Sequence, residues 1–384
     1  MLLLRWLTGA ASTALLAIVL WDAFETIVLP RRVAGRIRLT RFFYRVTWRP
    51  WRRIAPLVPR RHGIAFLGFY GPFSLLLLLG IWAAAIVLAF GLLQWAAGSA
   101  LASGRAARFG TDLYMSGTTF FTLGLGDITP VTATAKTLAV LEAGIGFAFL
   151  AVVIGYFPVI YQAFSRREMA IALLDARAGS PPTAAELLWR YRWDHSGAAL
   201  DQLLSEWERW SADVLESHLS YPALAYFRSQ HYNQSWLGAL TTVLDTSALV
   251  MSGMQGRCVR QAALTFAMAR HAVVDLAQVF EAPRTVPPER LPAADLERLR
   301  TRLGEAGVRL DDGDGPDATL RQFDRLRHMY EPYVVALARY LALALPPIVR
   351  AAPRPDNWQT SAWEGPVTLP WLDAFDGEPD DVHF

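Results

Sequence analysis

The chain has 384 residues, of which 53% are hydrophobic and only 18% are charged, and its mean hydropathy is +0.24. Soluble domains carry about 25% charged residues, so this composition predicts that part of the chain lies in lipid. The single cysteine, Cys258, excludes a disulfide framework and a cysteine-based zinc cluster.

Charge divides the chain into two parts. Residues 1–165 contain fourteen arginines, one lysine and five acidic residues, a balance of +10. Residues 166–384 contain twenty-two arginines and twenty-nine acidic residues, a balance of −7. A basic, apolar part followed by an acidic, more polar part predicts a membrane domain with a soluble domain behind it. The pI of about 9.1 is therefore no sign of a nucleic-acid partner.

The first predicted element is a transmembrane helix within residues 1–30, with its apolar centre at Leu7–Trp21. Asp22 and Glu25 stand where a cleaved signal peptide would need small residues, so we expect the helix to be retained. Both carboxylates come shortly before an arginine-rich segment. We therefore expect a structural ion pair between them and that segment.

Residues 31–63 form a predicted cytoplasmic, interfacial segment. Its eleven arginines come without any acidic residue, and short loops of this composition stay in the cytoplasm. Aromatic residues alternate with the arginines, which is typical of a helix that lies along lipid headgroups. The segment is a topological anchor or, alternatively, a site for anionic membrane lipids that controls opening. The candidate lipid contacts are Arg41, Arg45, Arg49, Arg52 and Arg53.

Two longer apolar segments follow, at about residues 64–97 and 132–164. With residues 31–63 inside, the N-terminus and the 98–131 connection face outward, and residues 166–384 are cytoplasmic. These features predict a multi-pass protein of the cell membrane. Within the 98–131 connection, residues 109–121 have the length and apolarity of a short helix. We expect this helix to enter the membrane without crossing it.

Glycine occupies alternate positions directly after this short helix, in the sequence Thr122-Leu-Gly-Leu-Gly-Asp127. Glycine accepts positive φ at no steric cost, and an alternating left- and right-handed backbone turns successive carbonyls toward the same side. Unpaired backbone is tolerated at membrane depth only where it lines a cavity. Four such segments around one axis would present rings of oxygen atoms that replace the hydration shell of an ion.

The segment resembles the pore loop of potassium channels, including those of prokaryotes, whose signature is Thr-Val-Gly-Tyr-Gly-Asp. Thr122, Gly124, Gly126 and Asp127 match identically, and Leu123 replaces valine conservatively. Leu125 replaces the usual aromatic residue and is similar to the second pore loop of some two-pore-domain potassium channels. The resemblance covers residues 64–165, with the pore helix and filter at about 109–127. It implies a tetrameric pore of outer helix, pore helix, filter and inner helix.

The resemblance, and the positions of residues within the transmembrane segments, predict functions for several individual residues. The filter residues Thr122, Leu123, Gly124 and Leu125 would bind K⁺, and no other cofactor is implied. Tyr114, Thr118 and Glu142 are candidate filter supports, and Asp127 needs a partner such as Tyr114, Thr118 or water. Two roles fit Glu142, a hydrogen bond to the pore loop or attraction of cations. The candidates for gating, by bending or loosening the inner helix, are Gly146, Gly155 and Pro158.

A single pore loop cannot close a ring, so the sequence predicts a homotetramer. The predicted function is a potassium-selective channel. The alternatives are a weakly selective cation channel and a membrane-anchored sensor whose pore does not conduct. No pattern of nucleophile and base, or of paired carboxylates, indicates an enzyme.

Residues 166–352 show apolar residues at helical spacing, which predicts a mostly α-helical domain. We expect this domain to bind a regulatory ligand that the sequence does not identify. An irregular tail is expected at 353–384. His218, Arg228 and His231 form either a ligand pocket or a satisfied polar network. The acidic stretch Asp311–Asp317 lacks the closing glutamate of a calcium loop, so an exposed turn is expected there.

Overall fold

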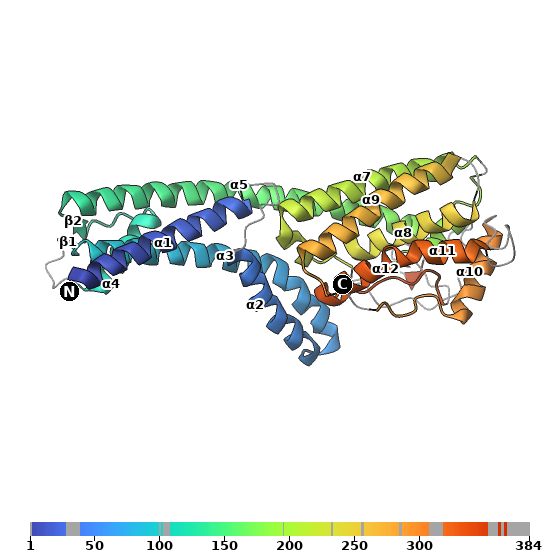
Figure 1. Ribbon diagram of the computed structural model, residues 1–384, viewed down its shortest axis with the longest axis horizontal. Coiled ribbons are helices and arrows are strands. Elements are labelled where there is room, and N and C mark those ends of the chain that lie inside the picture. Colours follow the sequence, from blue (N-terminus) through green and yellow to red (C-terminus); the bar gives the residue numbers. More distant parts are fainter. Residues whose placement is uncertain are drawn as a thin grey trace. The chain divides into compact units, whose positions relative to one another are not determined.

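The computed structural model is helical almost throughout. It describes residues 2–27, 39–99, 101–102, 108–194, 196–231, 233–254, 257–283, 286–306, 318–351, 360–361 and 365–366. Apart from two pairs of two-residue strands, the elements of these residues are helices, which confirms the predicted all-α class (Figure 1). Contacts divide the chain into two compact units, Met1–Gln162 and Ala163–Phe384.

Within the described residues, three helices are long and apolar enough to cross a membrane, at Leu2–Ile27, Gly63–Ala96 and Ala133–Ala178. They correspond to the three apolar segments of the sequence, and the chain is a membrane protein. Some predictions fall outside the described residues. These are the conformation of residues 31–38, the acidic stretch Asp311–Asp317 and most of the tail at 353–384.

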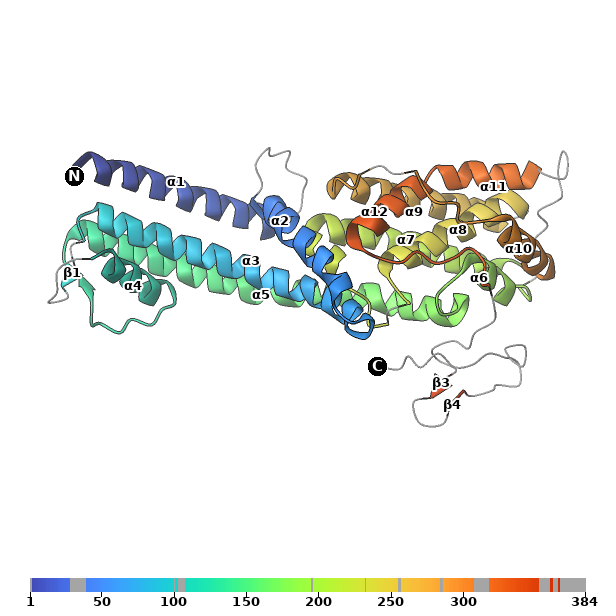
Figure 2. The same ribbon diagram turned by 90° about the horizontal axis from the view of Figure 1, so that it is seen from below.

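Helix α1 (Leu2–Ile27) lies along helix α3 (Arg60–Ala96) in the first unit (Figure 2). The buried carboxylate of Asp22 on α1 accepts hydrogen bonds from the backbone nitrogen of Thr40 at 3.2 Å, from its hydroxyl at 2.8 Å, and from the Trp82 indole nitrogen at 3.1 Å. Among the described residues, Asp22 thus meets neutral donors where the sequence predicts an ion pair. The reason is that Thr40 begins the next helix, whose first N–H groups lack partners within the helix.

That next helix, α2 (Leu39–Ile54), forms a hairpin with the start of α3 through the short helix η1 (Ala55–Leu57) (Figure 1). The Trp51 ring stacks on Phe66 of α3 with 4.5 Å between centroids, and its indole nitrogen donates to the Phe66 carbonyl oxygen at 3.0 Å. Trp48 packs 4.7 Å from Tyr70. The aromatic side of α2 is therefore covered by α3. The structure thus adds aromatic partners on α3, while the predicted position of this helix along lipid headgroups stays a prediction.

Helix α4 (Phe109–Phe120) lies against α3, helix α5 (Ala133–Ala178) runs alongside α3, and the predicted pore loop follows α4 (Figure 2). Helix α4 is only twelve residues long, which is too short to span a bilayer. Two short antiparallel strands, β1 (Leu101–Ala102) and β2 (Thr129–Pro130), pair the segment before α4 with the segment after the loop. This pairing joins the segment after the loop to the segment that precedes α4.

Helix α5 continues beyond the predicted end of the third span at residue 164. Its 46 residues make a helix about 69 Å long, more than twice the thickness of a hydrocarbon core. The extension persists because Ile171, Leu174 and Ala178 on one side of it are buried in the second unit. Pro158 lies inside α5 without ending it.

The second unit is a helical bundle. Its remaining elements are α6 (Ala184–Arg190), α7 (Ala198–Ser220), η2 (Pro222–Tyr226), α8 (Trp236–Gly253), α9 (Arg257–Val279), α10 (Ala293–Glu305), α11 (Ala318–His328), α12 (Glu331–Leu341), β3 (Thr360–Ser361) and β4 (Gly365–Pro366). Strands β3 and β4 pair antiparallel. Helix α8 is the centre of the bundle, because every residue from Trp236 to Val250 is buried.

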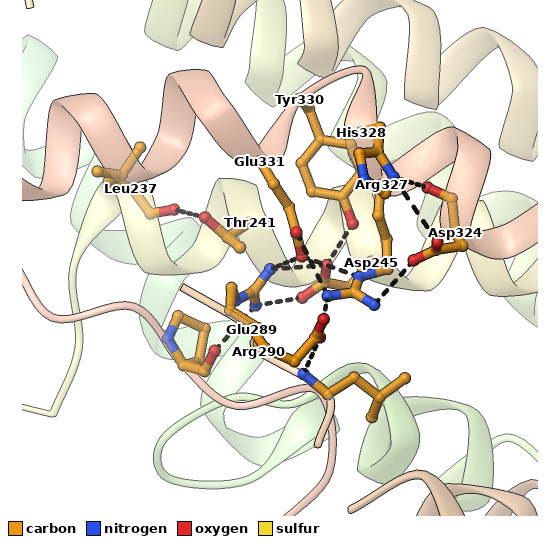
Figure 3. Close-up of polar contacts among 12 residues, drawn as sticks. Leu237, Thr241, Asp245, Glu289, Arg290, Asp324, Arg327, His328, Tyr330 and Glu331 are labelled. Carbon is orange, nitrogen blue, oxygen red and sulfur yellow. Dashed lines mark hydrogen bonds and ion pairs between the residues drawn. The ribbon is translucent and has the colours of Figure 1, made fainter. Parts of the chain in front are cut away.

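A buried cluster of charged residues joins distant segments of this bundle (Figure 3). Arg290 donates to Asp245 of α8 at 2.7 Å and to Glu331 of α12 at 3.2 Å. The same guanidinium donates to the Pro346 carbonyl oxygen at 2.9 Å, and the Tyr330 hydroxyl donates to Asp245. A buried ion is costly unless it is paired and hydrogen-bonded, and here every charge has partners. The cluster therefore fixes the loop before α10 and the segment after α12 onto the central helix.

Candidate ion-conduction site

The pore loop begins where α4 ends. The backbone nitrogen of Leu123 donates to the carbonyl oxygen of Thr118 at 2.8 Å, and that of Thr122 donates to Thr119 at 3.0 Å. These bonds satisfy carbonyl groups that the last turn of a helix leaves without partners. They also place the loop directly on the helix end, so that the position of α4 determines the position of the loop.

Beyond this point the backbone alternates in handedness. Thr122, Gly124 and Gly126 have φ values of 58°, 55° and 76°, and these three residues are separated by single leucines. Positive φ is ordinary for glycine, but for a β-branched residue such as Thr122 it is strained. Strained backbone of this kind concentrates at functional sites. Positive φ at every second residue is the conformation that the glycine spacing predicts.

All six residues from Thr122 to Asp127 are exposed in the single chain. The exposed fractions of Leu123 and Leu125 are 61% and 63%, although both are large and apolar. Such a surface is unusual in water or lipid, because two large apolar side chains stand beside backbone polar groups that lie outside any helix or sheet.

The predicted support residues lie behind the loop. The Tyr114 side chain of α4 interacts electrostatically with the Asp127 side chain, so Tyr114 stays a candidate partner of Asp127. Thr118 instead donates its hydroxyl to the Met115 carbonyl oxygen of its own helix at 2.9 Å. Glu142 of α5 is fully buried and hydrogen-bonded to Ser116 of α4. Of its two predicted roles, the geometry thus favours the hydrogen bond to the pore-loop region.

Three further contacts hold the helices of the pore module together, and the sequence reasoning missed them. The Ser99 hydroxyl donates to Asp112 at 2.6 Å, in the first turn of α4, where a carboxylate interacts favourably with the helix dipole. The Gln94 side-chain nitrogen donates to the Ala135 carbonyl oxygen at 3.1 Å, which joins α3 to α5. Gly91 lets the backbone of Leu113 approach α3, because a Cβ at residue 91 would lie 3.2 Å from the Leu113 Cα atom.

The gating candidates differ in their surroundings. A Cβ atom at Gly146 would overlap the carbonyl oxygen of Phe120, whereas one at Gly155 would meet nothing within 4 Å. Helix α5 is continuous through Gly146, Gly155 and Pro158. Gly146 therefore has a packing role against the end of α4, and bending at any of the three residues stays a prediction.

The candidate lipid contacts lie together on α2. All five side chains are exposed, and the apolar side chains of Phe42 and Val46 are exposed on the same helix. The buried aromatic side and the exposed basic side make α2 amphipathic, as the sequence predicts. The exposed arginines are Arg41, Arg45, Arg49, Arg52 and Arg53.

Arg167 of α5 is buried in the second unit, and this burial was not predicted from the sequence. Its guanidinium donates to the carbonyl oxygens of Leu224 and Phe227 at 2.9 and 2.7 Å, pairs with Glu168 at 2.9 Å, and approaches Nε2 of His218 at 3.3 Å. Nδ1 of His218 lies 2.8 Å from the Val214 carbonyl oxygen, which only accepts, so Nδ1 carries the proton. Nε2 is then the acceptor for Arg167.

Burial, reinforced by the positive charge of Arg167, lowers the pKa of His218 to about 3. The histidine is therefore neutral at pH 7, in agreement with its hydrogen bonds. Arg228 lies elsewhere and donates to the carbonyl oxygens of Leu341 and Ala342 at the end of α12. His218 and Arg228 thus belong to two satisfied polar networks, which was one of the two readings of the sequence.

The short helix, the alternating loop and two flanking long helices together define a pore module of a membrane channel. Residues 74–162 match the model of a family described as ion channel, a segment that contains α4 and the whole loop. The protein is therefore an ion channel and not an enzyme. No curated protein and no solved structure matches the chain.

Proposed function

We propose that the protein is a potassium-selective channel that works as a homotetramer in the cell membrane. The single observation that carries this proposal is the alternation of positive φ at Thr122, Gly124 and Gly126. In such a backbone successive carbonyl groups point to one side. Four copies around an axis would stack these oxygens into rings that replace the hydration shell of K⁺, with the Thr122 hydroxyls as a further ring.

The exposure of the loop supports the oligomer. In one chain the large apolar side chains of Leu123 and Leu125 have no cover, and Phe121 beside them is 60% exposed. Neighbouring copies of the same loop and helices would cover these side chains and leave the carbonyl groups facing the axis. Closed fourfold symmetry makes the site complete, since each chain supplies one quarter of every ring.

We further propose that the channel opens and closes through α5. This helix runs from the pore loop into the second unit, where Arg167 binds two backbone carbonyl groups. A change in the bundle, caused by a ligand still to be identified, would reach the inner helix through this bond. The arginine-rich helix α2 would face the cytoplasm and anionic lipids, with the N-terminus outside.

Ion flux from liposomes tests the proposal. Purified full-length protein should release K⁺ and retain Na⁺ under matched gradients, and Gly124→Ala should abolish the flux because a Cβ atom strains the positive φ at this residue. Gly80→Ala on α3 is the matched control, since a Cβ atom at residue 80 would meet nothing within 4 Å. Equal flux of K⁺ and Na⁺ would favour a weakly selective cation channel, for which the missing aromatic at Leu125 is the structural argument. Absence of flux with and without the bundle would favour a non-conducting sensor.

A further inference from the structure

The hydroxyl group of Ser116 connects three helices of the pore module. Ser116 lies on α4 and is fully buried. Its Oγ atom is 2.7 Å from the carbonyl oxygen of Val87 on α3 and is also hydrogen-bonded to Oε1 of Glu142 on α5. One oxygen atom thus joins the outer helix, the pore helix and the inner helix, four residues before the pore helix ends.

The number of available protons decides how these two bonds are made. A serine hydroxyl donates one proton and accepts with its lone pairs, while a backbone carbonyl oxygen only accepts. The bond to Val87 therefore uses the serine proton. An ionised carboxylate also only accepts, so the second bond then needs a proton on Glu142. The reverse assignment would leave two oxygen atoms 2.7 Å apart with no proton between them.

The surroundings of Glu142 agree with this count. The side chain is completely buried, and its Oε2 atom has no hydrogen-bond partner among the described residues. No basic side chain among those residues pairs with Glu142, and Lys136 on the same helix is exposed. A buried carboxylate without a counter-charge is strongly unfavourable, whereas a neutral acid is tolerated.

We propose that Glu142 is held as a neutral carboxylic acid that donates its proton to Ser116, and that it thereby positions the pore helix for ion selection. Glu142 is a positioning residue on this account, and it does not attract cations. Its effect reaches the filter through α4, because the Thr118 carbonyl, two residues after Ser116, accepts the hydrogen bond from Leu123. The selectivity part of this inference rests on the proposed potassium channel, but the protonation part does not.

The protonation part is tested by infrared difference spectroscopy on the full-length protein in membranes at neutral pH. The spectrum of the wild type minus that of Glu142→Gln should contain the carbonyl stretch of a carboxylic acid. The matched control is Glu206→Gln, at a half-exposed glutamate of the second unit, which should remove only carboxylate bands. Carboxylate bands in the Glu142→Gln difference would overturn the proposal.

The positioning part is tested by the ratio of K⁺ to Na⁺ flux in liposomes. A glutamine amide is neutral and can still donate, so Glu142→Gln should keep the ratio within about twofold. Glu142→Leu and Ser116→Ala each remove one end of the bond and should lower the ratio by about tenfold, the effect of losing one hydrogen bond. Size-exclusion chromatography identifies any variant that fails to assemble.

An unchanged ratio in both Glu142→Leu and Ser116→Ala would refute the positioning role. A low ratio in Glu142→Gln would also refute it, because the donor is still present. If the wild type shows no selective flux, the proposed function fails, and the infrared result still decides the protonation of Glu142.

Discussion

Gly146 of α5 packs directly on the carbonyl oxygen of Phe120, the last residue of the pore helix. The contact is so close that any side chain at residue 146 must displace the end of α4, from which the pore loop starts. A sequence that places glycine in the middle of an inner helix suggests a hinge. In this fold the same glycine also permits an intimate contact between two helices.

Gly146→Ala should therefore disturb the pore itself. We expect at least a tenfold loss of K⁺ flux, because the new methyl group overlaps backbone atoms that cannot rotate away. Gly144→Ala is the control on the same helix, since residue 144 has open space around it. Wild-type flux in Gly146→Ala, measured in liposomes, would show that the contact is not important for conduction.

The side chain at residue 125 should set the degree of selectivity. A tyrosine hydroxyl at this position could hydrogen-bond the pore helix, and Leu125 cannot. The loop therefore lacks one stabilising hydrogen bond. We expect Leu125→Tyr to raise the ratio of K⁺ to Na⁺ flux severalfold, within the range that one hydrogen bond supplies. Leu125→Phe adds the ring without the hydroxyl group and serves as the control. Equal effects of both substitutions would attribute the change to ring packing instead.

The electrostatic interaction between Tyr114 and Asp127 should hold the outer end of the loop to the pore helix. Tyr114→Phe removes only the hydroxyl group and leaves the Asp127 carboxylate without this partner. We expect a lower K⁺ to Na⁺ ratio and no change in assembly, since the ring itself remains. Tyr333→Phe in the second unit is the matched control. Flux ratios measured side by side in liposomes would test the expectation, and indistinguishable values would contradict it.

Asp22 should stabilise the first unit through its neutral donors. Asp22→Ala leaves the Trp82 indole N–H and the backbone N–H of Thr40 without their acceptor, and each unsatisfied buried donor costs about 1–3 kcal/mol. We expect a clear fall in the Tm of the detergent-solubilised protein, followed by tryptophan fluorescence. Thr13→Ala removes a bond within α1 only and should have little effect. A Tm equal to that of Thr13→Ala would argue against this role.

His218 should make the second unit sensitive to acid. Its pKa in the folded protein is about 3, below the ordinary value of 6.5, so the unfolded chain binds the proton more readily. Stability from this residue is complete above pH 6.5 and falls by about 1.4 kcal/mol per pH unit as the pH decreases toward 3. Unfolding of His218→Gln should lack this dependence between pH 6 and 4. His271→Gln, at an exposed histidine, should keep it.

Much of the pore could be predicted from the sequence, because its chemistry depends on a continuous segment. The spacing of Gly124 and Gly126 dictates where positive φ is possible, and the structure has it there. The three spans follow from apolar length alone. The interfacial helix was predicted from arginines interleaved with aromatic residues, although its aromatic partners on α3 were not predicted.

Only the tertiary structure decided which buried polar groups meet. Ser116 has no pattern that distinguishes it from any other serine in a helix, yet it joins Val87 and Glu142. In the sequence, Arg167 is one of several charged residues after the third apolar segment. Its burial depends on the packing of η2, which places the carbonyl groups of Leu224 and Phe227 against it. Such contacts link residues from 26 to 60 positions apart, and their geometry is set by helix packing. The sequence by itself determined the local backbone of the pore loop, whereas packing determined what holds it in place.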